Sequence, residues 1–104
     1  MDDLAARFLP QFLKLARSRL EQVREAAEDR GPAALATAAG GLHTLAGEAG
    51  LLGFHEVVPL ARDCELKIKS LQAGQVDGEV EQLLAALGQL ERVIEHIGAT
   101  RVSR

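Results

Sequence analysis

The sequence predicts an all-α fold, an antiparallel up-down-up-down four-helix bundle with a short N-terminal leading helix. Leu and Ala dominate the composition, Trp and Tyr are absent and β-branched residues are few, which favours helices over strands. Apolar residues recur at helical spacing in four long segments, and Gly or Pro interrupts the pattern between them. The connections are short, so consecutive helices are expected to run antiparallel.

The first segment contains a proline near its start. Because Pro10 should break the helical pattern, a short leading helix is expected around Leu4 and Phe8, separate from the long helix that follows. Gly31-Pro32 should close that long helix. Its apolar positions share the helical period, at Leu9, Phe12, Leu13, Ala16, Leu20, Val23 and Ala27.

The second helix is expected from about Ala33 to Leu52. Its apolar stripe consists of Leu35, Ala38, Leu42, Leu45, Ala49 and Leu52. The third helix should end at Gly74 and hold Pro59 in its first turns, where a missing amide hydrogen costs least. Its seam alternates steps of three and four residues, at Val57, Ala61, Cys64, Ile68 and Leu71.

The fourth helix is expected to start near Asp77 as its N-cap and to end before Gly98. Its apolar repeat is Val80, Leu83, Leu84, Leu87, Leu90, Ile94 and Ile97. Residues 1–104 are expected to form one domain, in which residues 99–104 are a frayed tail.

Charge and cysteine content argue against several classes of partner. The net charge of -3 comes from 15 acidic and 12 basic residues that are interspersed, so no basic surface for nucleic acid is predicted. Cys64 is the only cysteine, which fits a reducing cytosol and a buried, inert thiol. No signal peptide or apolar run of 18 residues is recognisable, so a cytoplasmic protein without membrane contact is expected.

The most informative stretch is residues 40–54, where several glycines lie within a helical pattern at a cost of about 1 kcal/mol each. At about 100° per residue, Gly40, Gly47 and Gly50 lie within about 60° of His43 around the helix axis. The apolar stripe is centred about 130° from His43. The imidazole should therefore point away from the core, with room for a phosphoryl group and a docking protein.

Geometry alone supports a structural explanation of the same glycines equally well. In that alternative, the small residues let another helix approach closely, and His43 is a residue at the boundary of the core. A phosphate-binding loop fits less well, because the glycines follow no strand and no Gly-Lys-Ser or Gly-Lys-Thr is present.

Residues 43–54, HTLAGEAGLLGF, resemble the signature of the histidine-containing phosphotransfer (HPt) domain family. In that signature the phosphoacceptor His is followed by Gly four, often seven, and ten positions later. The resemblance implies that His43 is the phosphoacceptor, that Gly47 keeps its surroundings open and that Gly53 ends the helix. One position departs from the pattern: the family usually has Lys three residues after the His, where this chain has Ala46.

An imidazole nucleophile keeps one nitrogen free while an acceptor holds the other. If the second and third helices form an antiparallel hairpin, residues whose numbers sum to about 108 lie at one height, so His43 faces Glu65. We hypothesise that Glu65 holds the Nδ1 hydrogen and leaves Nε2 to take the phosphoryl group. Phosphotransfer domains of chemotaxis-type kinases, which this stretch is similar to, carry Glu at the matching place.

Arg62, at the height of Ala46, is a candidate to replace the missing lysine charge. The alternative for Glu65 and Arg62 is a solvated ion pair of little energetic value.

The resemblance implies a phosphocarrier that is not an enzyme. Its partners would be the receiver domain of a response regulator and a sensor histidine kinase, which contact the protein as a monomer. The docking surface is expected to consist of Gly40, Ala46, Gly47, Gly50 and Phe54. No metal site or cofactor of its own is expected, and Mg²⁺ is expected on the receiver.

Two alternatives stay open at this point. The first is a structural or adaptor bundle that is never phosphorylated. The second is a dimerisation segment of a histidine kinase, which would need an ATP-binding domain in the same chain.

Overall fold

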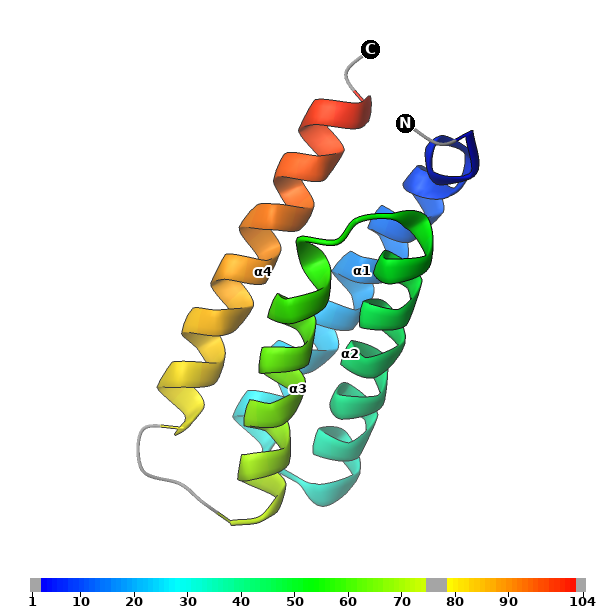
Figure 1. The fold of residues 1–104 in the computed structure, drawn as a ribbon. Helices are drawn as coiled ribbons and strands as arrows, with labels where there is room; N and C mark the ends of the chain where they lie inside the picture. Colours follow the sequence, from blue (N-terminus) through cyan, green and yellow to red (C-terminus); the bar gives the residue numbers. More distant parts are fainter. Residues whose placement is uncertain (1–2, 75–78, 103–104) are drawn as a thin grey trace.

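Four helices make up the computed structural model, which describes residues 3–74 and 79–102 and the side chains of residues 5–74 and 80–100. They are α1 (Asp3–Asp29), α2 (Pro32–Leu52), α3 (Val57–Gln72) and α4 (Glu79–Val102). Consecutive helices run antiparallel (Figure 1), and α1 and α3 each pack against both α2 and α4. The predicted all-α, up-down-up-down four-helix bundle is confirmed.

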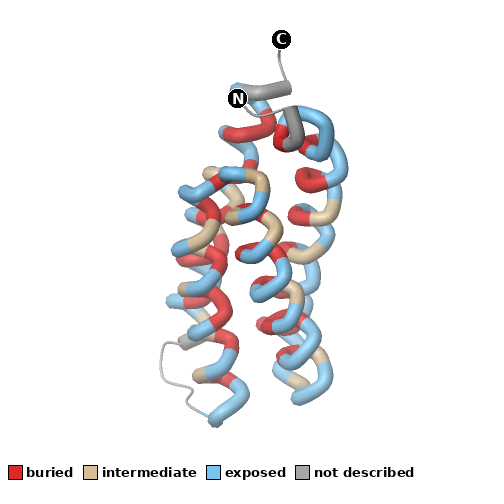
Figure 2. The backbone as a smooth tube through the Cα atoms, turned by 45° about the vertical axis from the view of Figure 1, so that its right-hand side comes forward, coloured by how far each residue is buried: buried red, intermediate tan, exposed pale blue. Residues whose placement is uncertain are grey.

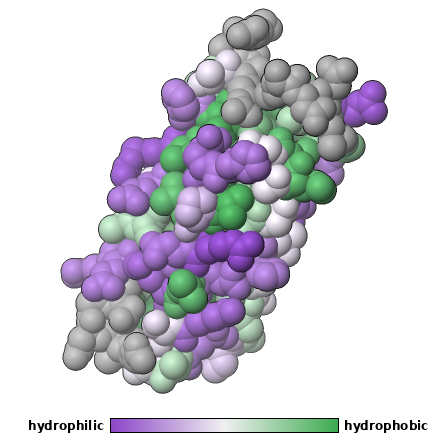
Figure 3. Space-filling model, viewed as in Figure 1, coloured by the Kyte–Doolittle hydropathy of each residue, from purple (hydrophilic) through white to green (hydrophobic). Residues whose placement is uncertain are grey.

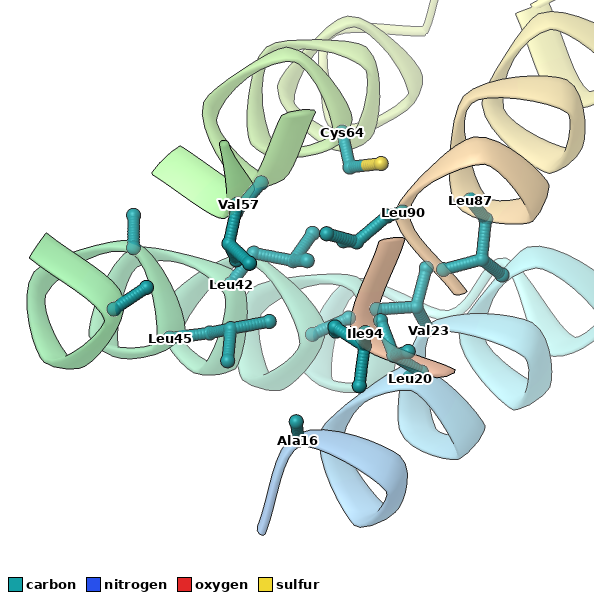
Figure 4. Packing of buried hydrophobic residues seen from close by; sticks show 14 of the residues in the cluster. Ala16, Leu20, Val23, Leu42, Leu45, Val57, Cys64, Leu87, Leu90 and Ile94 are labelled. Atoms are coloured by element: carbon teal, nitrogen blue, oxygen red, sulfur yellow. The ribbon is translucent and has the colours of Figure 1, made fainter. Parts of the chain in front are cut away.

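The core lies along the axis of the bundle, where buried positions of every helix face inward (Figure 2). Side chains from all four helices meet there, as Figure 4 shows for Val23, Leu42, Cys64 and Leu90. Full burial of each large aliphatic side chain contributes about 1.5 to 3 kcal/mol. One predicted core position is wrong: Leu84 is 40% exposed, because it lies about 100° around α4 from the buried Leu83.

The prediction of a separate leading helix is wrong, because α1 continues through Pro10. A proline inside a helix removes one hydrogen bond and crowds the carbonyl four residues earlier, at a cost of about 3 kcal/mol. The apolar stripe nevertheless passes through this position, since Ala5, Leu9, Phe12 and Leu13 on either side of it are all buried. Their burial on one face offsets the loss and keeps the two parts of the helix in register.

The turn between α2 and α3 follows the prediction for Gly53, which adopts a left-handed conformation with φ of 84°. The Gly53 amide donates to the Gly50 carbonyl at 3.2 Å, and the Phe54 amide donates to the Ala49 carbonyl at 2.8 Å. These two bonds close the end of α2 and reverse the chain into α3. Pro59 is the third residue of α3, within the first turn as expected.

The prediction that the fourth helix ends before Gly98 is wrong, because α4 continues to Val102. A Cβ atom at Gly98 would lie 3.3 Å from Leu13 Cδ1, so this glycine permits close packing of α4 on α1. The part of the predicted frayed tail up to Val102 is therefore helical. The expected N-cap Asp77 and residues 103–104 lie outside the described residues. No helix in the described part of the chain is long and apolar enough to span a bilayer.

Candidate functional site

His43 lies in the middle of α2 with 72% of its side chain exposed, while the preceding Leu42 is fully buried. The helical geometry that places the apolar stripe away from His43 therefore holds in the folded chain. The exposed imidazole has only small or short side chains nearby on its own helix. The adjacent Thr44 hydroxyl is turned back to donate to the Gly40 carbonyl at 3.0 Å.

The glycines near His43 divide between the two explanations that the sequence left open. A Cβ atom added at Gly40 or Gly47 would meet no atom within 4 Å, so both positions border open space. A Cβ at Gly41 would lie 3.5 Å from Arg19 Cγ, and one at Gly50 would lie 3.7 Å from Val58 Cγ2. Gly40 and Gly47 thus keep the surface beside His43 bare, whereas Gly41 and Gly50 lie where neighbouring helices pack.

Glu65 of α3 contacts the imidazole from the side, with Oε2 3.4 Å from His43 Nδ1. This distance is slightly longer than an ordinary hydrogen bond and short enough to tighten into one. Only 12% of the Glu65 side chain is exposed, so the contact joins a nearly buried carboxylate to an exposed imidazole. The hairpin geometry correctly brings residues 43 and 65 together, and Nε2 is the nitrogen that Glu65 leaves free.

Lys69 is the cation at this site, and the sequence analysis missed it. Its Nζ lies 3.3 Å from the same Glu65 Oε2 that contacts His43. The available signal was the spacing of a glutamate four residues before a lysine, the more favourable order for an ion pair on one helix.

Arg62, the candidate to replace the missing lysine charge, is not paired with Glu65. The residue is exposed on α3, and it forms no ion pair with any residue whose side chain the structure describes. At three residues before Glu65 it lies one turn away on the side opposite to Lys69. The Glu65 carboxylate therefore pairs with Lys69, one turn later on α3, and not with Arg62, one turn earlier.

Two residues expected at the docking surface are buried instead. Ala46 is 2% exposed, because it lies about 60° around α2 from His43 on the side that α3 covers. Phe54 is fully buried, and its ring packs against Phe12 with centroids 5.0 Å apart, because the turn at Gly53 directs the chain back into the core. Gly50 is half-buried beneath α3. Of the five expected residues, Gly40 and Gly47 remain openly exposed.

An exposed apolar surface towards the C-terminal end of α2 comes from residues that were not among the expected site residues. Leu51 is 78% exposed near the end of α2, and with Phe8, Leu15 and Leu52 it lines a shallow, mostly apolar groove between α1 and α2. Figure 3 shows a pale, weakly polar strip along the edge formed by α2, beside the strongly hydrophilic surface of α3.

The two other histidines lie apart from this site. His55 is exposed in the turn before α3, and His96 lies on α4 within 3.4 Å of the Thr100 hydroxyl. Within the described residues, no three His, Cys, Asp or Glu side chains gather closely enough to hold a metal ion.

A comparison with protein families matches an Hpt domain model to residues 7–100, a range that contains His43, Glu65 and Lys69. Comparisons with curated proteins and with solved structures returned no match. The family match covers most of the chain and agrees with its four-helix architecture. The chain therefore belongs to the Hpt domain family, whose members are phosphocarrier modules of phosphorelays without a nucleotide site of their own.

Proposed function

We propose that this protein accepts a phosphoryl group on Nε2 of His43 and exchanges it with the aspartate of a response-regulator receiver domain. The observation that supports this assignment most directly is the exposed imidazole with its Nδ1 beside the nearly buried Glu65 carboxylate. A sensor histidine kinase and a receiver are the partners, and we place the exchange in the cytoplasm.

In the accepting direction, the Nε2 lone pair attacks the phosphorus of an aspartyl phosphate. The N–P bond forms as the O–P bond breaks, and the aspartate leaves as a carboxylate. The proton stays on Nδ1, so the phosphorylated ring carries a positive charge. The Glu65 carboxylate lies beside that charge and stabilises it, and transfer to a receiver runs through the same steps in reverse.

Alignment and charge stabilisation dominate the catalysis of phosphoryl transfer, so the carrier needs little more than a correctly held imidazole. We assign the Mg²⁺ that balances the phosphoryl charge to the receiver. The carrier contributes the open surface at Gly40 and Gly47, where a Cβ atom would meet nothing within 4 Å.

We place the docking of the receiver on the exposed face of α2. Leu51 lies about 80° around the helix from His43 and about 12 Å along it. It offers the apolar contact that the sequence analysis assigned to Phe54, since Leu51 is 78% exposed. The neighbouring Glu48 is paired with Arg19 of α1, which leaves the strip around His43 without a free carboxylate on α2.

The test is to incubate the protein with radiolabelled phospho-receiver domains and phospho-kinases from the same organism. The wild type, His55→Gln and His96→Gln should acquire an acid-labile label, whereas His43→Gln should acquire none. His55 and His96 are matched controls because both lie on the surface away from His43. Label on His43→Gln would contradict the assignment. A wild type that no phospho-partner labels would favour the adaptor bundle instead.

A further inference from the structure

A single carboxylate oxygen connects His43 with a lysine. Glu65 Oε2 lies 3.4 Å from His43 Nδ1 and 3.3 Å from Lys69 Nζ. The carboxylate is nearly enclosed, with 12% of the Glu65 side chain exposed, whereas Lys69 is 58% exposed. The imidazole and the ammonium group therefore share one acceptor at the edge of the core.

A carboxylate in such an enclosed position needs a partner that carries a positive charge. A neutral His43 supplies a hydrogen-bond donor without that charge. Without the ammonium group, the carboxylate would keep only its contact with the imidazole and would be held less firmly beside Nδ1. A carboxylate that moves away from Nδ1 no longer favours the arrangement in which Nδ1 carries the hydrogen and Nε2 is free.

Other charged groups do not replace Lys69 at this carboxylate. On α3, Arg62 is exposed and unpaired among the described side chains. On α2, Glu48 pairs with Arg19 of α1, about 140° around the helix from His43. Within the described part of the chain, Lys69 is thus the cation in contact with Glu65.

We propose that Lys69 is a positioning residue for phosphotransfer that acts on His43 through Glu65. Its ammonium group pairs with Oε2 and holds the carboxylate beside Nδ1, so that Glu65 accepts the Nδ1 hydrogen and Nε2 stays free. It also reduces the net charge that the incoming phosphoryl dianion meets, because the Glu65–Lys69 pair is neutral overall. This inference rests on the proposed function for its kinetic consequence and on the geometry alone for its effect on the imidazole tautomer.

Lys67 provides a matched control on the same helix. It pairs with Asp63 at 2.9 Å, also at a spacing of four residues. It lies about 200° around α3 from Glu65, on the side that faces away from α2. Lys67→Met therefore makes the same chemical change as Lys69→Met without altering the contact with Glu65.

The experiment compares Lys69→Met, Lys69→Arg and Lys67→Met with the wild type. ¹⁵N chemical shifts of the His43 ring report which nitrogen carries the proton, and labelled phospho-receiver gives the transfer rate. Lys69→Met should reduce the fraction protonated on Nδ1 alone and slow transfer by about tenfold. Lys69→Arg keeps the positive charge and should retain the wild-type tautomer and transfer rate. Lys67→Met should change neither property.

A Lys69→Met protein with the wild-type tautomer would overturn the inference, and so would an equal loss in Lys67→Met. These outcomes are separable from a failure of the proposed function. If the wild type accepted no label on His43, the phosphocarrier assignment would fail, while the ring nitrogen shifts would still test whether Lys69 controls the imidazole.

Discussion

Gly40 and Gly47 are the residues at which helix stability and access to His43 oppose each other. Glycine in a helix costs about 1 kcal/mol relative to alanine. Where two helices pack closely, the closer approach that glycine allows offsets this cost. A Cβ atom at Gly40 or Gly47, however, would meet nothing within 4 Å. Packing within the described residues therefore does not call for glycine at these positions, and under the proposed function the bare surface serves the approach of a partner to the imidazole.

Replacing Gly47 with Ala should therefore raise the free energy of unfolding by up to about 1 kcal/mol and slow phosphotransfer. The added methyl group improves the helix but stands beside the attacking nitrogen. Urea denaturation and the transfer rate from a phospho-receiver measure the two effects.

Gly88→Ala is the control, because Gly88 lies within α4 and a Cβ there would meet only the flexible Arg92 side chain, at 3.7 Å. It should gain stability with an unchanged transfer rate. A Gly47→Ala protein that transfers as fast as the wild type would show that the partner tolerates bulk at this position.

Among the elements, the ends of the first three helices use the same backbone conformation with different residues. Arg30, Gly53 and Gly74 follow α1, α2 and α3 with φ values of 61°, 84° and 87°. Only Arg30 carries a side chain, which is unfavourable in this left-handed region. Glycine and proline mark these helix ends in the sequence, so the first junction could be predicted at Gly31-Pro32, whereas the positive φ of Arg30 could not.

Arg30→Gly should stabilise the protein by about 1 kcal/mol, because glycine adopts a positive φ without steric cost. Gly53→Ala should destabilise it by a similar amount for the same reason, and it would also weaken the turn that reverses the chain after α2. Both residues lie outside the helices, so helix propensity does not contribute. Denaturation midpoints measured under identical conditions test the opposite signs, and a stabilised Gly53→Ala would contradict the explanation.

The whole molecule determines the chemistry of its single thiol. Cys64 is fully buried between α3 and its neighbours (Figure 4). Burial, with a smaller contribution from the negative charge of Asp63, raises its pKa from 9.0 to about 11. Lys67 opposes this shift weakly. The thiol is therefore inert in the folded state, as the sequence analysis expected.

This shift predicts a loss of stability in alkaline solution. An unfolded thiol releases its proton near pH 9, whereas the folded protein holds it until about pH 11. The unfolded state binds fewer protons in this window, so the contribution of Cys64 is complete below pH 9 and is lost as pH rises towards 11. At about 1.4 kcal/mol per pKa unit, the free energy of unfolding should fall by about 2 to 3 kcal/mol.

Urea denaturation between pH 8 and pH 11 measures this slope, and Cys64→Ala should flatten it. The alanine variant is expected to be less stable at neutral pH because it leaves a small cavity, so slopes rather than absolute values are compared. Equal slopes in the two proteins would mean that other groups, such as lysines, cause the alkaline loss.

The sequence by itself determined the features that depend on helical period and chain reversal. The period of 3.6 residues sets which side of α2 is apolar, so His43 could be assigned to the exposed side. An antiparallel hairpin sets which residues share a height, so Glu65 could be placed opposite His43, as the 3.4 Å contact confirms. The exposed side of a helix and the height of residues in a hairpin both follow from regular helix geometry, which the spacing of apolar residues in the sequence reveals.

Only the tertiary structure decided which sides of α2, next to His43, the neighbouring helix and turn cover. Ala46 and Phe54 are buried and Leu51 is exposed, because α3 and the turn after Gly53 cover one side of α2 and leave another open. Lys69 rather than Arg62 pairs with Glu65, and the spacing of four residues within α3 was a signal that the sequence already contained. The burial of Ala46 and Phe54, by contrast, depends on contacts between segments far apart in the chain, which helical periodicity does not specify.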